Sequence, residues 1–137
     1  MVDKILKEYK KLLERKITEK DPEFYNIINY KWNKDGTLDV DGHVFIESMN
    51  LTKIPFKFGV VTGFFSCMDN ELTSLEGCPR EVGECAYFSL NYKLKSLKYF
   101  PRKIGDNVWI RNCGKDFDEE YIRARCDVGG SVFVGEM

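Results

Sequence analysis

A short internal repeat is the feature that most constrains how this chain can fold. Three segments share a pattern of proline, two variable residues, an apolar residue and glycine: Pro55–Gly59, Pro79–Gly83 and Pro101–Gly105. A Leu-x-x-(Leu/Ile) step precedes each of them, beginning at residues 51, 72 and 94. Units of about 21 or 22 residues cannot bury an apolar face alone, so neighbouring units must stack into a solenoid.

An alternating apolar segment lies ahead of these steps and recurs through the chain. Its apolar pairs are Val44/Ile46, Phe65/Cys67, Ala86/Phe88, Val108/Ile110 and Val132/Val134. Because strand side chains alternate between two faces, each pair predicts one short strand per coil with its apolar pair pointing inward. Asn70 and Asn91 follow three residues after Cys67 and Phe88, where an amide can satisfy backbone groups as the chain leaves the strand. The sequence therefore predicts an α/β repeat protein, a right-handed solenoid of about five coils.

The best copy of the repeat carries a more specific signal. Residues 65–83 read FSCMDNELTSLEGCPREVG, which resembles the leucine-rich repeat. The sequence of this copy is similar to the short, degenerate leucine-rich repeats of proteins from large tailed bacteriophages, which read close to L-T-S-L-E-G-C-P-x-x-V-G-G. Residues 72–83 match this pattern almost fully, residues 94–105 match it loosely, and residues 51–59 are a shortened copy.

This resemblance covers residues 36–134, and residues 116–134 look like the terminal unit of those proteins. It implies a small phage accessory protein that works in the cytoplasm of the bacterial host. The role it implies is binding to another protein of the host or the phage, for example to inhibit a component of an antiviral defence system. We expect no cofactor.

The segments that flank the repeats are predicted to close the solenoid. Residues 3–19 have the spacing of an amphipathic helix, with apolar residues at Val2, Ile5, Leu6, Tyr9, Leu12, Leu13 and Ile17. Lys34–Gly36 lies between two alternating segments, which predicts a hairpin that begins the sheet. We therefore expect a single domain, with residues 1–20 as a capping helix and residues 21–137 as the leucine-rich-repeat-like solenoid with its entry hairpin. Residues 117–126 are expected to form a short helix in the last coil.

The outward side of the strands is the strongest candidate for a functional surface. The residues between the apolar pairs are Phe45, Ser66, Tyr87, Trp109 and Phe133. Four of these five are aromatic, where solvent-facing strand positions are usually polar. Aromatic, Met and Arg side chains are enriched at interface hot spots. We therefore expect a non-enzymatic, protein-binding face made of Phe45, Phe64, Met68, Tyr87, Trp109, Arg111 and Phe133.

Four alternatives to this interpretation remain open at the sequence level. The aromatic residues could serve only to stabilise the sheet by packing across strands, or the N-terminal segments could cover them. The protein could instead be a self-associating assembly protein, pairing through the edge strand at residues 132–134. The basic face of the N-terminal helix could bind nucleic acid, but the formal net charge of the chain is -1 and glutamates interrupt the basic residues.

Catalytic and metal-binding patterns are weak in this chain. His43 is the single histidine, and we expect it two coils from Cys85, the thiol at the matching outward position. None of the five cysteines forms a C-x-x-C pair, so no zinc site is expected. Residues 33–39 match part of a calcium loop but lack two of its acidic ligands. No apolar run is long enough for a membrane span and no secretion signal is present, so we expect a cytoplasmic protein without a membrane partner.

Overall fold

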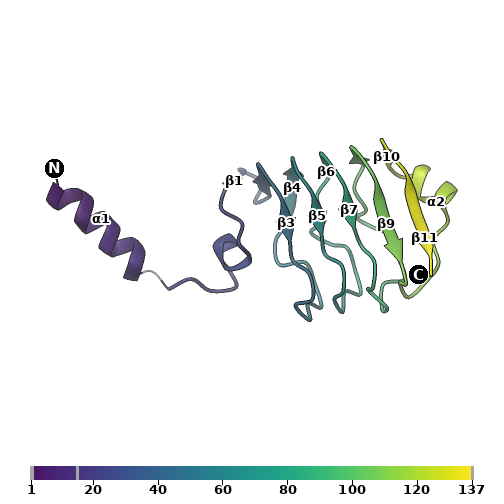
Figure 1. Ribbon diagram of the computed structural model, residues 1–137, viewed down its shortest axis with the longest axis horizontal. Helices are drawn as coiled ribbons and strands as arrows, with labels where there is room; N and C mark the ends of the chain where they lie inside the picture. Colours follow the sequence, from purple (N-terminus) through teal and green to yellow (C-terminus); the bar gives the residue numbers. More distant parts are fainter. Residues whose placement is uncertain (1, 15, 137) are drawn as a thin grey trace.

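Two sheets face each other along the solenoid (Figure 1), and the computed structural model describes residues 2–14 and 16–136. The front sheet contains β3 (Val44–Phe45), β5 (Phe65–Ser66), β7 (Ala86–Tyr87), β9 (Val108–Arg111) and β11 (Val132–Gly135). The back sheet contains β1 (Tyr30–Trp32), β2 (Leu38–Val40), β4 (Phe58–Val61), β6 (Glu81–Val82), β8 (Lys103–Ile104) and β10 (Asp127–Val128). The helical segments of the described chain are α1 (Val2–Glu14), the 3-10 helix η1 (Pro22–Tyr25) and α2 (Glu119–Arg123).

The predicted repeat architecture is confirmed, with one correction. Successive strands of the front sheet pair in parallel, and so do those of the back sheet from β2 onward. Each coil therefore has two strands, whereas the sequence analysis expected one. The second strand lies in the Pro-x-x-apolar-Gly segment, as β6 and β8 show. Its apolar residue points into the core, as Val82 and Ile104 show with exposed fractions of 1% and 0%.

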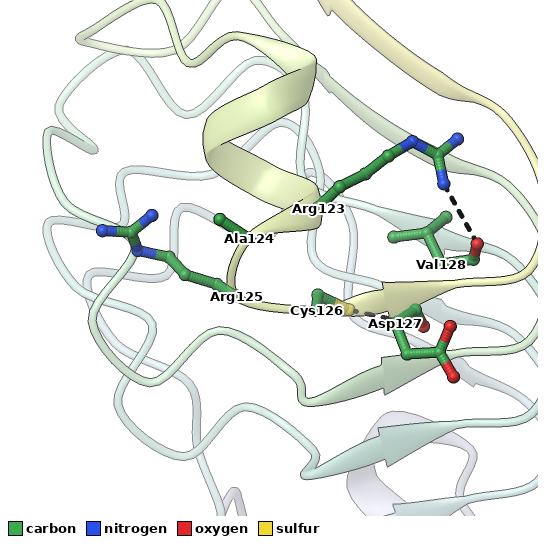
Figure 2. A pocket seen from close by; sticks show the side chains of 6 residues that line it. All are labelled: Arg123, Ala124, Arg125, Cys126, Asp127 and Val128. Atoms are coloured by element: carbon green, nitrogen blue, oxygen red, sulfur yellow. Dashed lines mark hydrogen bonds between the residues drawn. The ribbon is translucent and has the colours of Figure 1, made fainter.

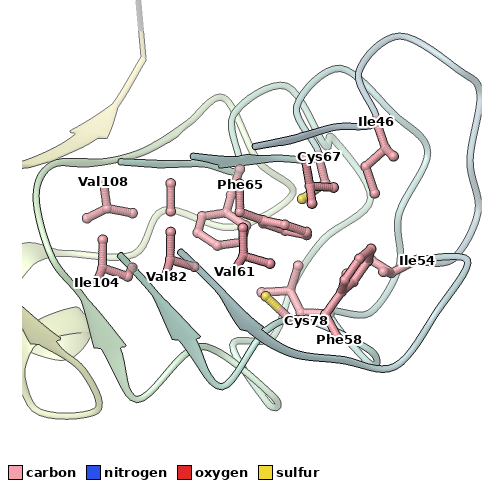
Figure 3. Packing of buried hydrophobic residues seen from close by; sticks show 14 of the residues in the cluster. Ile46, Ile54, Phe58, Val61, Phe65, Cys67, Cys78, Val82, Ile104 and Val108 are labelled. Carbon is pink, nitrogen blue, oxygen red and sulfur yellow. The ribbon is translucent and has the colours of Figure 1, made fainter. Parts of the chain in front are cut away.

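The core lies between the two sheets (Figure 3). Side chains of Ile46, Phe65 and Cys67 enter from the front sheet side, and Val61, Val82 and Ile104 enter from the back sheet. The first four predicted inward pairs are buried, with exposed fractions of 2% or less. Val132 and Val134 of the last pair are only half-buried, because β11 lies at the edge of the front sheet and pairs with β9 on one side. The strand register predicted from the sequence is therefore correct for the front sheet.

Glycines set how closely the coils stack along the back sheet. A Cβ atom added at Gly83 would collide with the backbone carbonyl oxygen of Thr62, and one added at Gly105 would collide with that of Gly83. These contacts are with backbone atoms of the preceding coil, which cannot rotate away. The glycines that end the second and third Pro-x-x-apolar-Gly segments, Gly83 and Gly105, are therefore required by close packing between coils.

The two asparagines have the predicted structural role. The Asn70 side-chain amide donates to the carbonyl oxygens of Ile46 and Cys67, at 2.7 and 3.0 Å. Its Oδ1 atom accepts hydrogen bonds from the backbone N–H groups of Met49 and Leu51, both at 3.0 Å. Each asparagine thus connects its own coil to the preceding one at the point where the front strand ends.

The N-terminal end differs from the expectation in one respect. The hairpin forms as predicted, with β1 antiparallel to β2. The helix also forms, but it ends at Glu14 and stands apart from the first coil (Figure 1). Its apolar side chains remain exposed, including 60% of Ile5 and 52% of Leu6, so the predicted capping role is wrong for this structure. The side chains of Leu12 and Leu13 lie outside the described part. The first coil is instead covered by β1 and by the segment that contains the buried Tyr25 and Ile27.

The C-terminal coil contains the expected short helix. Asp118 caps α2, since its side chain accepts a hydrogen bond from the Tyr121 N–H at 2.7 Å. Ile122 is fully buried and fixes the helix against the core. Within the residues that the structure describes, no helix is both long enough and apolar enough to cross a membrane.

Candidate binding surface on the front sheet

The outward aromatic residues of the front sheet form one row across the coils. Strand pairing places Tyr87 beside Trp109, and Trp109 beside Phe133. The Tyr87 and Trp109 rings stack with centroids 4.7 Å apart and planes 6° from parallel. The Trp109 and Phe133 rings stack in the same way, at 4.9 Å and 14°. These residues are half-buried, so the row contributes to the outer surface while its rings support one another.

Ser66 interrupts this row, and its surroundings differ from the expectation. It was expected to point outward to solvent, but it is fully buried. Its hydroxyl group has no hydrogen-bond partner among the described residues. The small side chain leaves space in which the Phe64 ring can bridge its neighbours, since its centroid lies 6.3 Å from Phe45 and 6.4 Å from Tyr87. Ring contacts therefore continue along the front sheet through Phe45, Phe64, Tyr87, Trp109 and Phe133, which we call the aromatic ladder.

The stacking determines which parts of the rings a partner can reach. Neighbouring rings cover both faces of Trp109, so its edge is the part left to meet a partner. A ring edge carries the positive end of the aromatic quadrupole, which favours contact with carbonyl oxygens, carboxylates and the faces of other rings. Phe45 at the first coil is more open, with 51% of its surface exposed. The ladder is thus a rigid surface that loses little side-chain entropy on binding.

Arg111 and Met68 flank the ladder, as the sequence analysis expected. The Arg111 guanidinium carbon lies 5.5 Å from the centre of the Phe133 ring, in cation–π range. The Nε atom of Arg111 is buried and has no hydrogen-bond partner in the described part of the chain. Met68 is half-buried and lies 21 residues, one repeat, before Ser89. Ser89 in turn lies one repeat before Arg111, and its hydroxyl accepts a hydrogen bond from the Arg111 backbone N–H. The predicted site residues therefore lie on one face of the front sheet.

His43 joins this surface, although it was not among the residues predicted for the binding face. Its ring stacks on Phe64 with centroids 4.5 Å apart and planes 20° from parallel. Its Nδ1 atom accepts a hydrogen bond from the Phe64 backbone N–H at 2.9 Å, and a Glu84 carboxylate oxygen lies 3.8 Å from the same atom. The spacing of 21 residues between His43 and Phe64 was the signal in the sequence, because it equals the repeat length.

The thiols behave as small apolar side chains. All five cysteines are free, and Cys85 is buried close to Tyr87. Burial is the main cause that raises the pKa of the Tyr87 hydroxyl, with Cys85 a smaller one. Burial also raises the pKa of the Cys67 thiol above its usual range and that of Cys126 to about 11. These groups are protonated near neutral pH and are therefore poor nucleophiles.

Two other regions offer little chemistry. In the loop at residues 33–39, Asp35 accepts hydrogen bonds from the backbone and side chain of Thr37, which lower its pKa and use it within the turn. In the described residues, no group of three or more His, Cys, Asp or Glu side chains could hold a metal ion. A shallow pocket at the end of α2 is shown in Figure 2, where the Arg123 guanidinium donates to the carbonyl oxygen of Val128. The same guanidinium also donates to the carbonyl oxygen of Gly130.

Comparison with known proteins found no relative of this chain. No family model, no curated protein and no solved structure matches the chain.

Proposed function

We propose that this chain is a non-enzymatic protein-binding module, and that the aromatic ladder is the surface that contacts the partner. The observation that carries the proposal is the row of touching rings that runs across the coils on the outward side of the front sheet. Surface patches of this composition usually mark interaction sites. Arg111 at the end of the row adds a charged anchor of the type enriched at hot spots.

The identity of the partner is proposed from the resemblance to phage leucine-rich-repeat proteins. On that basis the module is an accessory protein of a bacteriophage, acts in the host cytoplasm, and binds a host or phage protein. A component of a host antiviral defence system fits this role, with binding as the means of inhibition. This assignment of the partner rests on analogy between sequence motifs.

A pull-down from bacterial lysate, with the double variant Tyr87→Ser/Trp109→Ser beside the wild type, tests the binding surface. The two substitutions remove the central stacked pair. Circular dichroism establishes that the variant is folded. The matched control is Tyr92→Ser/Tyr99→Ser, which removes two tyrosines that lie outside the ladder and are 64% and 47% exposed.

The proposal expects a partner that the wild type and the control capture and the folded double variant loses. Capture by all three proteins would place the binding site elsewhere on the molecule. Because hot-spot residues typically contribute about 2 kcal/mol or more, the affinity for the purified partner should fall by at least about 30-fold.

A second candidate is self-assembly through β11. This strand is the last of the front sheet, and its residues Val132, Phe133 and Val134 are only half-buried. An edge strand of this kind can pair with the same strand of a second copy. A substitution of Val132 to Lys would then lower the mass measured by light scattering, whereas the ladder variant would leave it unchanged.

A further inference from the structure

Exposed apolar side chains are concentrated at the N-terminal end of the molecule. Of the thirteen large hydrophobic residues exposed in the described chain, ten lie between residues 2 and 49. They are Val2, Ile5, Leu6, Tyr9, Ile17, Phe24, Ile28, Trp32, Phe45 and Met49. Only Phe45 belongs to the aromatic ladder, so most of this apolar surface is unexplained by the proposed binding site.

The helix α1 accounts for one part of it. The exposed fractions of Val2, Ile5, Leu6 and Tyr9 are 69%, 60%, 52% and 59%. An isolated helix of 13 residues is only marginally stable in water, and most helices in proteins are stabilised by packing of the apolar face. A helix of this length and pattern therefore requires a surface on which to pack.

The open end of the first coil provides a second apolar surface, which we call the entry surface. Phe24 contacts Tyr25 with ring centroids 5.0 Å apart, and Trp32 contacts Phe56 at 5.9 Å. The Tyr25 and Phe56 rings, 5.6 Å apart, connect the two pairs. Phe24 and Trp32 are 47% and 49% exposed, and Tyr25 and Phe56 also line an adjacent groove together with Leu51 and Pro55.

The chain between these two surfaces is short. A turn at residues 18–21 is closed by hydrogen bonds between Thr18 and Asp21, at 2.9 Å through the Asp21 N–H and at 3.0 Å through the Asp21 carboxylate. Only residues 15–17 separate this turn from the end of α1. The helix points away from its own first coil (Figure 1). A short connection of this kind disfavours folding back and favours exchange of the helix between two copies.

The segment that contains α1 and the rest of the chain carry opposite net charges. Residues 2–17 carry six Lys and Arg against three Asp and Glu, a net charge of +3. The formal net charge of the chain is -1, so the remaining residues carry -4. Attraction between the basic helix and the acidic solenoid of another molecule supports an encounter between copies.

We propose that α1 of one copy packs its apolar face on the entry surface of a second copy, and that the second copy returns its own helix in the same way. This gives a dimer with two-fold symmetry and two identical contacts. The aromatic ladder lies on the front sheet and is not part of either contact. The inference is therefore independent of the proposed binding function.

Light scattering over a range of protein concentrations tests the dimer. The wild type should have the mass of two chains. Ile5→Glu/Leu6→Glu places charges on the helix face and should raise the dimer dissociation constant by at least about tenfold. Phe24→Ser/Trp32→Ser should have the same effect from the other side of the contact. Tyr92→Ser, which changes an exposed residue outside both surfaces, is the control and should keep the wild-type mass.

Mixing the two double variants separates exchange from packing within one chain. One protein then has an intact entry surface and the other has an intact helix, so one of the two contacts can form. The proposal expects the mixture to contain a species of dimer mass at concentrations where each variant alone is a monomer. Thermal unfolding of each variant establishes that its solenoid is folded.

Three results would overturn the proposal. A wild type of monomer mass at all concentrations is one of them. The second is a dimer that the helix variant retains, which would indicate that the copies pair through another surface such as β11. A mixture that stays monomeric while both variants are folded is the third, because it would mean that each helix packs on its own chain or on a different partner.

Discussion

At the residue scale, Asn91 shows how one side chain can join two coils. Its amide donates to the carbonyl oxygens of Cys67 and Phe88 at 3.1 and 2.9 Å, and its Oδ1 atom accepts from the Leu72 N–H at 3.3 Å. The residue is fully buried. Removal of the side chain would leave backbone groups of two coils unsatisfied in the interior, where each such group is expensive.

We therefore predict that Asn91→Ala lowers the free energy of unfolding by about 2–4 kcal/mol, since at least two buried groups lose their partner. Urea unfolding followed by circular dichroism measures the change. Asn29→Ala, at an exposed position, is the control and should change it by less than about 0.5 kcal/mol. Equal effects of the two substitutions would contradict the bridging role of Asn91.

The buried thiols predict a dependence of stability on pH. The pKa of Cys126 rises from its usual 9.0 to about 11 because of burial, and Asp127 contributes in the same direction. A group whose pKa is higher in the folded protein contributes its full stability below the unfolded pKa and loses it as the pH rises toward the folded pKa. The free energy of unfolding should therefore decline between about pH 9 and pH 11.

Urea unfolding at pH 8, 9, 10 and 10.5 measures this decline. In Cys126→Ala the decline should be less steep than in the wild type, because one of the responsible groups is absent. Parallel curves for the two proteins would show that ionisation of Cys126 makes no contribution.

At the scale of secondary-structure elements, the periodicity of the sequence predicted which elements form better than it predicted what each element packs against. The front-sheet strands follow directly from the alternation in pairs such as Phe65/Cys67, because inward and outward positions differ in composition. The back-sheet strands were missed because strands such as β6 and β8 each contribute a single buried apolar residue, Val82 or Ile104, so the sequence shows no alternating pair there. The proline and the glycine that enclose each of these segments are typical of bends.

The helices show the same limit. The spacing of Ile5, Leu6 and Tyr9 predicts an amphipathic helix correctly, but it contains no information on which surface the apolar face meets. For the candidate site, the row of outward residues was predicted from register alone. The place of Phe64 in the ladder was not, since it depends on how much space the buried Ser66 leaves between its neighbours.

The short helix α2 gives a prediction at this scale. Asp118 accepts a hydrogen bond from the Tyr121 N–H, and Glu119 and Glu120 follow it in the first turn. Asp118→Ala should destabilise the protein by about 1 kcal/mol, the usual effect of removing an N-cap. Thermal unfolding measures it, with Asp116→Ala, at an exposed position before the helix, as the control. A larger loss from Asp116→Ala would contradict the assignment of the cap.

At the scale of the whole molecule, stability is distributed along one axis, because each coil contacts only its neighbours. The central strands β5 and β7 have a paired strand on both sides, whereas β11 has one on a single side. Repeat proteins of this kind behave as linear arrays whose end units open most readily.

Hydrogen exchange should therefore follow position in the solenoid. We predict the slowest exchange for amides that bond between central coils, such as those of Cys67 and Phe88, and faster exchange toward β11. Measurement by NMR or mass spectrometry on the free protein tests this order. Protection of β11 equal to that of β7 would show that a neighbouring molecule covers this edge.

The parallel pairing of Val44 with Phe65 and of Phe65 with Ala86 also has a consequence for how such a protein can evolve. Equivalent residues of successive coils occupy equivalent places, so a duplication or deletion of one complete unit restores the same neighbours at the junction. A loss of residues 65–85, for example, would bring Ala86 beside Val44 without shifting any later strand. The length of the ladder, and with it the size of the partner surface that can be matched, is therefore a quantity that recombination within a single gene can change in whole steps.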